Sequence, residues 1–333
     1  MVRKECGRPS SHMNTLTETL NSLIQSWDLT FKNMRDDLTI SGSPERCLSR
    51  MVIEDDRKCL FILEKISPQN IARKGEIAET LSVLSHEGLE AVHPYLMNTS
   101  KFYITRHENH FWILKPYIEG VSLERPAYVH DGWRGRTMAA FLIELKERSH
   151  GIILDDGRNL FSITAFIADL LKRIEKHDKE LLPEIAPVIE CLDGEFFAAH
   201  NRLPIGFCHG DYHPLNIIWS KDSILSVIDW EFSGYKAEIY DLALLMGCIG
   251  MEDPAALTGP FIQELLRGLE NVYAPLSLQY LFEYIVAIRF AWLSEWLRNA
   301  DQDQEMIALE IDYMTFLMQA QGCLKDAWRT IPA

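Results

Sequence analysis

The sequence predicts an α+β fold with two lobes, in which a small β-rich N-lobe precedes a larger, mostly helical C-lobe. Two observations support this fold class. Short apolar or alternating runs, bounded by Gly, Pro, Ser and Asp, fill the chain up to about residue 120 and indicate strands. Beyond that point, apolar residues recur at i, i+3 and i+4 over long segments, which indicates amphipathic helices.

The N-lobe is expected to span 14–118 and to consist of strands and one helix. Residues 1–13 read as a leader or an artificial extension. Apolar runs separated by turn residues indicate strands within 38–66, and 71–86 has the apolar spacing of a helix that ends before Gly88. Two more strand-like runs follow at 101–107 and 110–120, so the N-lobe is predicted to be a small antiparallel sheet with one inserted helix.

In the C-lobe, expected at 119–333, most segments show helical periodicity. The predicted helical segments are 137–150, 161–182, 183–200, 261–273, 278–300 and the tail from 303. A short β interruption at 205–232 divides them and contains the motif "FCHGDYHPLN".

Composition excludes several classes of function. The formal net charge is −15, from 33 basic and 48 acidic residues, which argues against a nucleic-acid partner. Seven scattered cysteines without a C-x-x-C pair fit reduced thiols and a cytoplasmic location. The most apolar stretch, 285–297, is too short and too charged to span a bilayer, so no membrane partner is expected.

The segment 207–231 brings three oxygen-bearing side chains together. "IIWS" (217–220) and "ILSVI" (224–228) are strand-like runs joined by the turn "KDS", and they should pair as a hairpin. Such a hairpin places Asn216, before its first strand, beside Asp229, after its second, and Asp211 can reach the same end. Oxygen ligands of this kind suit Mg²⁺, with phosphate oxygens and water completing its coordination.

Chemistry separates the roles within this trio. Asp229 and Asn216 supply an anionic and a neutral ligand for the metal, which leaves Asp211 to accept a proton from an attacking hydroxyl. Two alternatives stay open. An Asp in a turn is often only turn chemistry. A metallophosphoesterase could use His209, Asp211 and His213 as ligands, but it would need further Asp/His clusters elsewhere in the chain.

"HGDYHPLN" followed by "VIDWEFSGYKAEIYDLA" resembles the aminoglycoside phosphotransferase and choline kinase superfamily, whose fold is protein-kinase-like. The resemblance implies that Asp211 is the catalytic base and that Asn216 and Asp229 bind Mg²⁺. It also implies that Asp241 is structural and that His209 braces the loop.

The same resemblance implies where a nucleotide would bind. Ser41, Gly42 and Ser43 would offer backbone donors to phosphates, and the segment from Lys115 to Tyr117 would meet adenine through main-chain groups. Pro116 in this segment lacks a backbone donor, which departs from the family pattern.

The lysine that the family uses to hold phosphates is displaced in this chain. Glu64 stands at the expected position and Lys65 follows it, so Lys65 faces the phosphates only if a bulge shifts the strand. Lys65 is nevertheless the expected phosphate-binding residue, and its helix partner would be Glu79 or Glu76, between which the sequence does not choose.

The function predicted on this basis is an ATP- and Mg²⁺-dependent kinase acting on a hydroxyl of a small molecule, such as an amino alcohol, homoserine, a sugar or an aminoglycoside. The cleft between the two lobes would bind the nucleotide. Glu231, Trp292 and Trp296 are candidate acceptor-binding residues. The displaced lysine and Pro116 support an alternative, a kinase-fold protein that binds nucleotide without turnover.

Overall fold

The computed structural model describes residues 11–152, 160–192, 194–299 and 303–330, and the chain divides into two compact units. The first unit comprises Met1–His86 and Val92–Glu119, and the second comprises Glu87–Ala91 and Gly120–Ala333. Residues 1–10 of the expected leader lie outside the described residues, whereas residues 11–13 open helix α1 (Ser11–Ile24).

The first unit is built on a five-stranded antiparallel sheet with the order β1-β2-β3-β5-β4. Its strands are β1 (Phe31–Met34), β2 (Ser49–Asp55), β3 (Leu60–Ile66), β4 (Thr105–His107) and β5 (His110–Pro116). Helix α2 (Ile71–His86) is the inserted helix that the sequence predicts. The run at 38–40, expected to be part of a strand, instead lies in the loop between β1 and β2.

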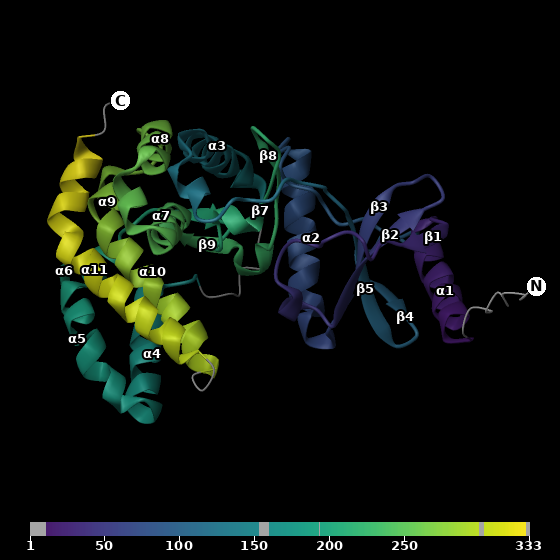
Figure 1. Ribbon diagram of the computed structural model, residues 1–333, viewed down its shortest axis with the longest axis horizontal. Coiled ribbons are helices and arrows are strands. Elements are labelled where there is room, and N and C mark those ends of the chain that lie inside the picture. The colour runs from purple at the N-terminus through teal and green to yellow at the C-terminus, as the bar shows by residue number, and fades with distance from the viewer. Residues whose placement is uncertain (1–10, 153–159, 193, 300–302, 331–333) are drawn as a thin grey trace, which may run out of the picture. The chain divides into compact units, whose positions relative to one another are not determined.

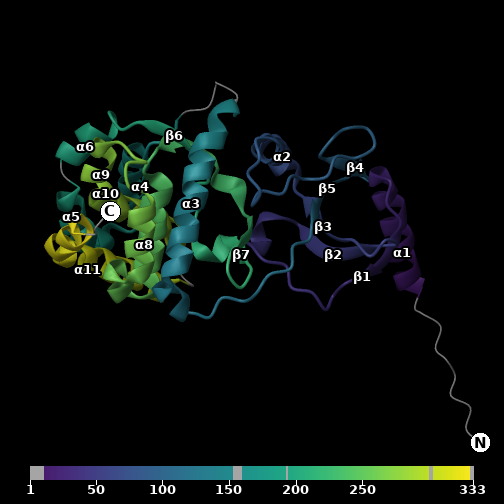
Figure 2. The ribbon, with the colours of Figure 1, turned by 90° about the horizontal axis from the view of Figure 1, so that it is seen from above.

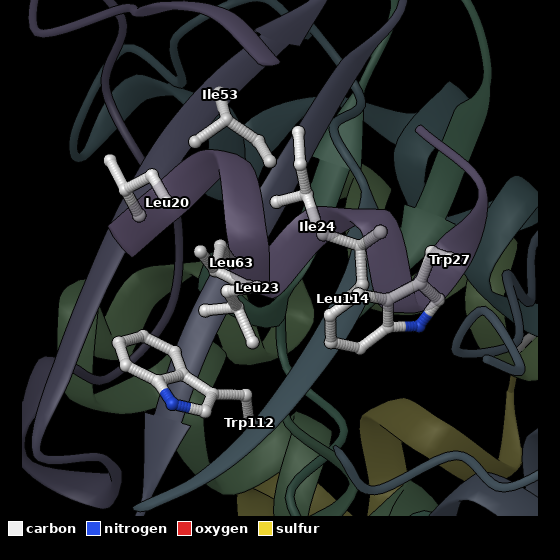
Figure 3. Close-up of a cluster of buried hydrophobic side chains, with 8 residues drawn as sticks. All are labelled: Leu20, Leu23, Ile24, Trp27, Ile53, Leu63, Trp112 and Leu114. Atoms are coloured by element: carbon white, nitrogen blue, oxygen red, sulfur yellow. The ribbon is translucent and has the colours of Figure 1, made fainter. Parts of the chain in front are cut away.

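Helix α1 was not predicted, and it completes the core of the first unit. Figure 3 shows its apolar side chains directed at the sheet. The buried cluster consists of Leu20, Leu23, Ile24 and Trp27 with Ile53, Leu63, Trp112 and Leu114. The Trp27 indole also donates to the carbonyl oxygen of Leu96 at 3.0 Å, so its polar atom is satisfied inside the apolar layer.

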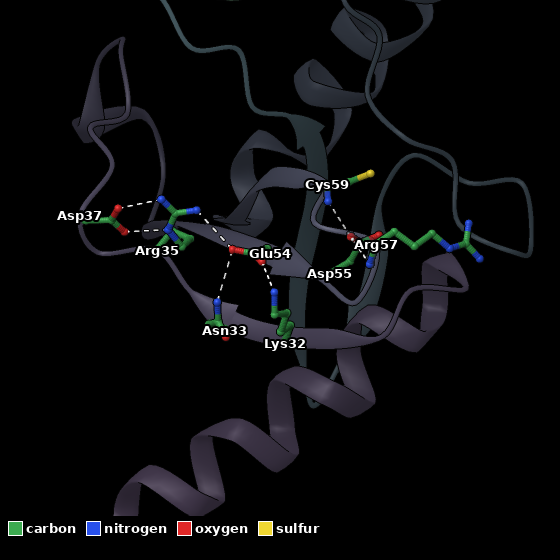
Figure 4. Close-up of polar contacts among 8 residues, drawn as sticks. All are labelled: Lys32, Asn33, Arg35, Asp37, Glu54, Asp55, Arg57 and Cys59. Carbon is green, nitrogen blue, oxygen red and sulfur yellow. Dashed lines mark hydrogen bonds and ion pairs between the residues drawn. The ribbon is translucent and has the colours of Figure 1, made fainter.

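A polar cluster on β1 and β2 fixes the outer edge of this sheet (Figure 4). The Glu54 carboxylate accepts from Lys32 at 2.5 Å and from Arg35 at 3.2 Å, and Arg35 also binds Asp37 through two nitrogens. These contacts join β1 and the first residues of the loop after it to β2, and that loop contains Ser41–Ser43.

The second unit is mostly helical, as predicted. Its helices are α3 (Gly132–Arg148), α4 (Ile163–His177), α5 (Leu182–Cys191), α6 (Gly194–His200), α7 (Tyr240–Glu252), α8 (Pro260–Gly268), α9 (Pro275–Gln279), α10 (Leu281–Trp296) and α11 (Gln304–Arg329). Its strands are β6 (Ile205–Cys208), β7 (Ile217–Trp219), β8 (Ile224–Val227) and β9 (Gly234–Ala237). β6 pairs with β9, and β7 pairs with β8.

Helices α3 and α8 pack closely, as Figures 1 and 2 both show. A Cβ added at Gly135 of α3 would lie 2.0 Å from the carbonyl oxygen of Phe261 in α8, so only glycine permits this approach. Among the residues that the structure describes, no helix combines the length and apolar character needed to cross a bilayer.

Candidate active site

The β7–β8 hairpin that the sequence predicts is present, and it brings the ends of its two strands together. Ile217 lies opposite Val227, and the backbone N–H of Ile228 donates to the carbonyl oxygen of Asn216 at 3.0 Å. Asn216 and Asp229 therefore flank the same end of one rigid element, as the hairpin geometry requires.

The Asp211 carboxylate is held at this end by Asn216, and His213 lies close to it. The amide nitrogen of Asn216 donates to the Asp211 main-chain oxygen and to its Oδ2, both at 2.9 Å. On the other side, Nε2 of His213 lies 3.5 Å from Asp211 Oδ1. The carboxylate is thus fixed in orientation, and the amide oxygen of Asn216, opposite its bound nitrogen, is the group that remains to meet a cation.

Asp241, at the start of α7, shapes the loop before Asp211. Its carboxylate accepts the backbone N–H of His209 at 2.7 Å and that of Gly210 at 2.8 Å. Gly210 has φ 84°, and a Cβ there would meet the carbonyl oxygen of Phe232 at 2.2 Å. Only glycine fits this position, and the loop is therefore fixed by two independent constraints.

His209 is a buried brace, as the family resemblance implies. Its Nε2 donates to the carbonyl oxygen of Ile228 at 2.9 Å, and its Nδ1 accepts the backbone N–H of Asp211 at 3.2 Å. Burial lowers the pKa of His209 to about 3, so the ring is neutral at physiological pH. Both ring nitrogens are bonded to the backbone, which disfavours His209 as a metal ligand.

Asp229 adopts a left-handed conformation, with φ 62° and ψ 57°, where β8 gives way to a short helical turn, Trp230–Phe232. Non-glycine residues in this region are uncommon and cluster at functional sites. Asp229, Asp211 and Asn216 carry oxygen donors of the kind that suits a hard cation such as Mg²⁺. In the parts of the chain that the structure describes, no group of three or more His, Cys, Asp or Glu is arranged to hold a metal ion.

The predicted acceptor residues lie in the same unit as this loop. The ring of Trp292 is 6.2 Å from that of His213, and Trp296 is 6.2 Å further along α10, measured between ring centroids. Glu231 follows Asp229 by two residues in the helical turn. The rings of His213, Trp292 and Trp296 therefore form a series of neighbours that starts beside Asp211.

In the first unit, the expectation for Lys65 requires correction. The register of β3 runs without a bulge against both β2 and β5, so Lys65 and Glu64 point to opposite faces of the sheet. Lys65 lies on the face that carries the α1 core, with its ammonium 5.7 Å from the Trp112 ring centroid. It is turned away from α2, and hence from Glu76 and Glu79, because α2 packs on the other face.

Lys74 is the α2 residue whose side chain contacts β3. Its ammonium lies 3.0 Å from Glu64 Oε1, and the Lys115 ammonium of β5 binds Glu64 Oε2. The strand therefore supplies the acid and the helix supplies the base, the reverse of the arrangement expected from the family. Sequence reasoning missed Lys74, although its place on the apolar face of 71–86, one turn before Ile77 and Ala78, was a signal.

The other predicted nucleotide residues also lie in the first unit. The Arg50 guanidinium donates to the carbonyl oxygens of Ser41 and Gly42, at 3.3 and 2.8 Å, and so fixes the loop that continues to Ser43. Tyr117 differs from expectation in one respect. Its backbone N–H is bonded to the Leu60 carbonyl oxygen at 3.0 Å, so this donor is already used within the sheet.

Comparison with known proteins places the chain among phosphotransferases. Residues 51–278 match the phosphotransferase enzyme family. The chain is 30% identical over 161 residues to a homoserine kinase of Rhodopseudomonas palustris, covering 47% of this chain and 45% of that protein. It is 25% identical over 170 residues to a homoserine kinase of Mesorhizobium japonicum, covering 50% of each chain. The chain thus matches about half the length of these curated relatives.

Solved structures share the fold at low sequence identity. An aminoglycoside phosphotransferase of Alicyclobacillus acidocaldarius aligns with a TM-score of 0.62 at 15% identity, covering 92% of this chain and 94% of that one. A choline/ethanolamine kinase family protein of Mesorhizobium loti aligns at 0.59 and 17%, covering 95% and 99%. The predicted α+β, protein-kinase-like fold is confirmed, and the chain belongs to the phosphotransferase enzyme family.

Proposed function

We propose that this protein is an ATP- and Mg²⁺-dependent kinase that transfers the γ-phosphoryl group to a hydroxyl of a small molecule. The observation that carries the proposal is the fixed carboxylate of Asp211, held through Oδ2 by Asn216 at 2.9 Å beside the hairpin end that also bears Asp229. An amicoumacin kinase with the same fold has been solved with AMP-PNP and Ca²⁺, which supports the use of a nucleotide and a divalent cation.

The geometry of the loop and hairpin supports the roles proposed for the side chains. Asp211 orients the acceptor hydroxyl and takes its proton as the phosphoryl group transfers. Asn216 and Asp229 hold Mg²⁺, which neutralises charge on the phosphate oxygens when it is bound. Asp241 and His209 act on the reaction only by fixing the backbone of the loop.

The acceptor is proposed to be a small hydroxyl compound, and one that also carries an amine is favoured. The homoserine kinases matched above favour homoserine or a related amino alcohol, and sugars and aminoglycosides remain within the proposal. Glu231 would bind the amine, and Trp292 and Trp296 would form an aromatic wall.

An ADP-release screen tests the proposal. The acceptor panel comprises homoserine, choline, ethanolamine, simple sugars and aminoglycosides, each with and without Mg²⁺, and mass spectrometry identifies the phosphorylated product. Asp211→Asn is the matched blank, because it keeps the size of the side chain and removes the base, and it should lower the rate by about 10²-fold or more. A variant that kept the wild-type rate would refute the role given to Asp211.

A second candidate, a kinase-fold protein that binds nucleotide without turnover, is favoured by one observation. The expected strand lysine is replaced by Glu64, which itself binds two lysines. This candidate predicts that magnesium–ATP raises the unfolding temperature while no acceptor releases ADP. The metallophosphoesterase alternative is disfavoured by the two backbone hydrogen bonds of His209.

A further inference from the structure

A group of charged side chains gathers on the α2 face of the first unit's sheet, and the sequence did not predict it. Glu64 of β3 lies opposite Arg50 of β2 in the strand register, so the two side chains share a face. Lys115 of β5 pairs with Ile62, two residues before Glu64, and therefore points to this face as well. Lys74 reaches the same place from α2.

These four groups carry an excess of positive charge. Glu64 is the acid, and its carboxylate binds both lysines, Lys74 through Oε1 and Lys115 through Oε2. Burial opposes ionisation of Glu64, but the two ammonium groups outweigh it and hold its pKa below the ordinary value. The described hydrogen bonds of Arg50 go to neutral carbonyl oxygens. Three basic side chains thus gather around one acid, in a chain whose net charge is −15.

Accessibility distinguishes the members of this group. The side chains of Lys74 and Glu64 are 4% and 5% exposed, whereas that of Lys115 is 26% exposed. The Lys115 ammonium also lies 5.6 Å from the ring centroid of Tyr95, which packs beside it. Lys115 is therefore a cation held in place by a buried acid, with part of its surface open to a ligand.

The loop 41–43 borders the same group. Arg50 fixes the carbonyl oxygens of this loop, and Gly42 has φ 90°, a conformation that favours glycine. Cys47 lies two residues before β2 begins, and burial together with the Glu64 carboxylate raises the pKa of its thiol. The charged group and the loop expected to cover phosphates are therefore adjacent within one unit.

We propose that Lys115 is the side chain that binds the nucleotide's phosphates. Glu64 on the strand and Lys74 on the helix form a buried ion pair that positions Lys115, with acid and base exchanged relative to the family arrangement. This assignment rests on the proposed use of ATP and replaces Lys65, which lies on the opposite face of the sheet. An anion is the chemistry that fits, because the partly exposed Lys115 ammonium, the nearby Arg50 guanidinium and the glycine loop favour a polyphosphate over a cationic ligand.

Binding measured without an acceptor tests the proposal, with ATP, AMP and adenosine as probes. Wild-type protein should bind ATP more tightly than adenosine. Lys115→Met should reduce this preference by about tenfold or more and leave adenosine affinity within about twofold. The variant should fold, because Glu64 keeps Lys74 as its partner. Lys65→Met is the matched control and should keep the preference, and Lys115→Arg should retain most of it because it keeps the charge.

Alkylation of Cys47 gives a second readout that does not depend on turnover. ATP and inorganic triphosphate should slow the reaction of Cys47 with iodoacetamide in the wild type, while adenosine should not. ATP and triphosphate should leave the alkylation rate of Cys59 unchanged, because Cys59 is exposed in the turn between β2 and β3. In Lys115→Met, protection by triphosphate should be lost.

The outcomes separate this proposal from the proposed function. An ATP preference that survives in Lys115→Met, or that disappears in Lys65→Met, overturns the assignment of Lys115. A wild type that does not prefer ATP to adenosine overturns it too. If the preference depends on Lys115 but no acceptor releases ADP, Lys115 is the phosphate residue and the phosphotransferase proposal is the one that fails.

Discussion

Asp241 shows how a single buried residue controls the geometry of the loop without touching a reacting atom. Its two oxygens accept the backbone N–H groups of His209 and Gly210, and the residue is 2% exposed. Burial raises the pKa of Asp241 to about 6, and the two N–H donors offset only part of this effect. The loop is thus held by a carboxylate whose ionisation is opposed by its surroundings.

This leads to a pH-dependent stability difference between wild type and Asp241→Asn. Because the pKa is higher in the folded state, the folded protein binds more protons than the unfolded chain between about pH 4 and pH 6, and the carboxyl's contribution to stability falls as pH rises. The unfolding free energy of wild type minus that of the variant should therefore fall by about 2.4 kcal/mol between about pH 4 and pH 7. Urea unfolding across this range measures it, and a constant difference would contradict the assignment.

At the scale of elements, the β7–β8 hairpin could be predicted from the sequence, whereas the ion pair between Glu64 and Lys74 could not. The hairpin could be predicted because two strand-like runs and a three-residue turn fix its register locally, and with it the proximity of Asn216 and Asp229. The side-chain face of Lys65 could not be fixed in this way. It depends on whether β3 contains a bulge, and that is decided by pairing with β2 and β5 rather than by the residues of β3.

Helix α1 was missed for a related reason. Leu20, Leu23 and Ile24 have helical spacing. The apolar face that they bury, which includes Leu63 and Trp112, exists only once the sheet is assembled. Lys74 was missed because a lysine on an apolar helix face is interpretable only once its partner is known. In each case, the missing information was contact between segments distant in sequence.

The contact between α3 and α8 gives a prediction at this scale. Gly135→Val should destabilise the protein by about 3 kcal/mol, because the new side chain would collide with the Phe261 carbonyl. Gly322→Ala in α11 is the matched control. No atom lies within 4 Å of a Cβ added there, and the substitution should stabilise the helix by about 0.5–1 kcal/mol. Denaturant unfolding measures both, and equal effects of the two substitutions would show that the close packing is unimportant.

At the scale of the whole molecule, ligand binding and stability are linked. If the chain binds magnesium–ATP, a concentration of about 100 times Kd should raise the unfolding free energy by about 2.7 kcal/mol. Asp229→Ala should lose the part of this stabilisation that requires Mg²⁺, while Asp222→Ala, in the hairpin turn, should retain it. Thermal unfolding with ATP in the presence of Mg²⁺ or a chelator measures the difference. Equal stabilisation of Asp229→Ala and wild type by Mg²⁺ would rule out Asp229 as a metal ligand.

The α1 layer has a practical consequence for anyone shortening this protein. A fragment that starts at Phe31, the first residue of β1, would leave Leu63, Trp112 and Leu114 on a bare sheet surface. Such a surface promotes self-association, so the fragment should be recovered in inclusion bodies when expressed in bacteria, even though every residue proposed for catalysis is still present.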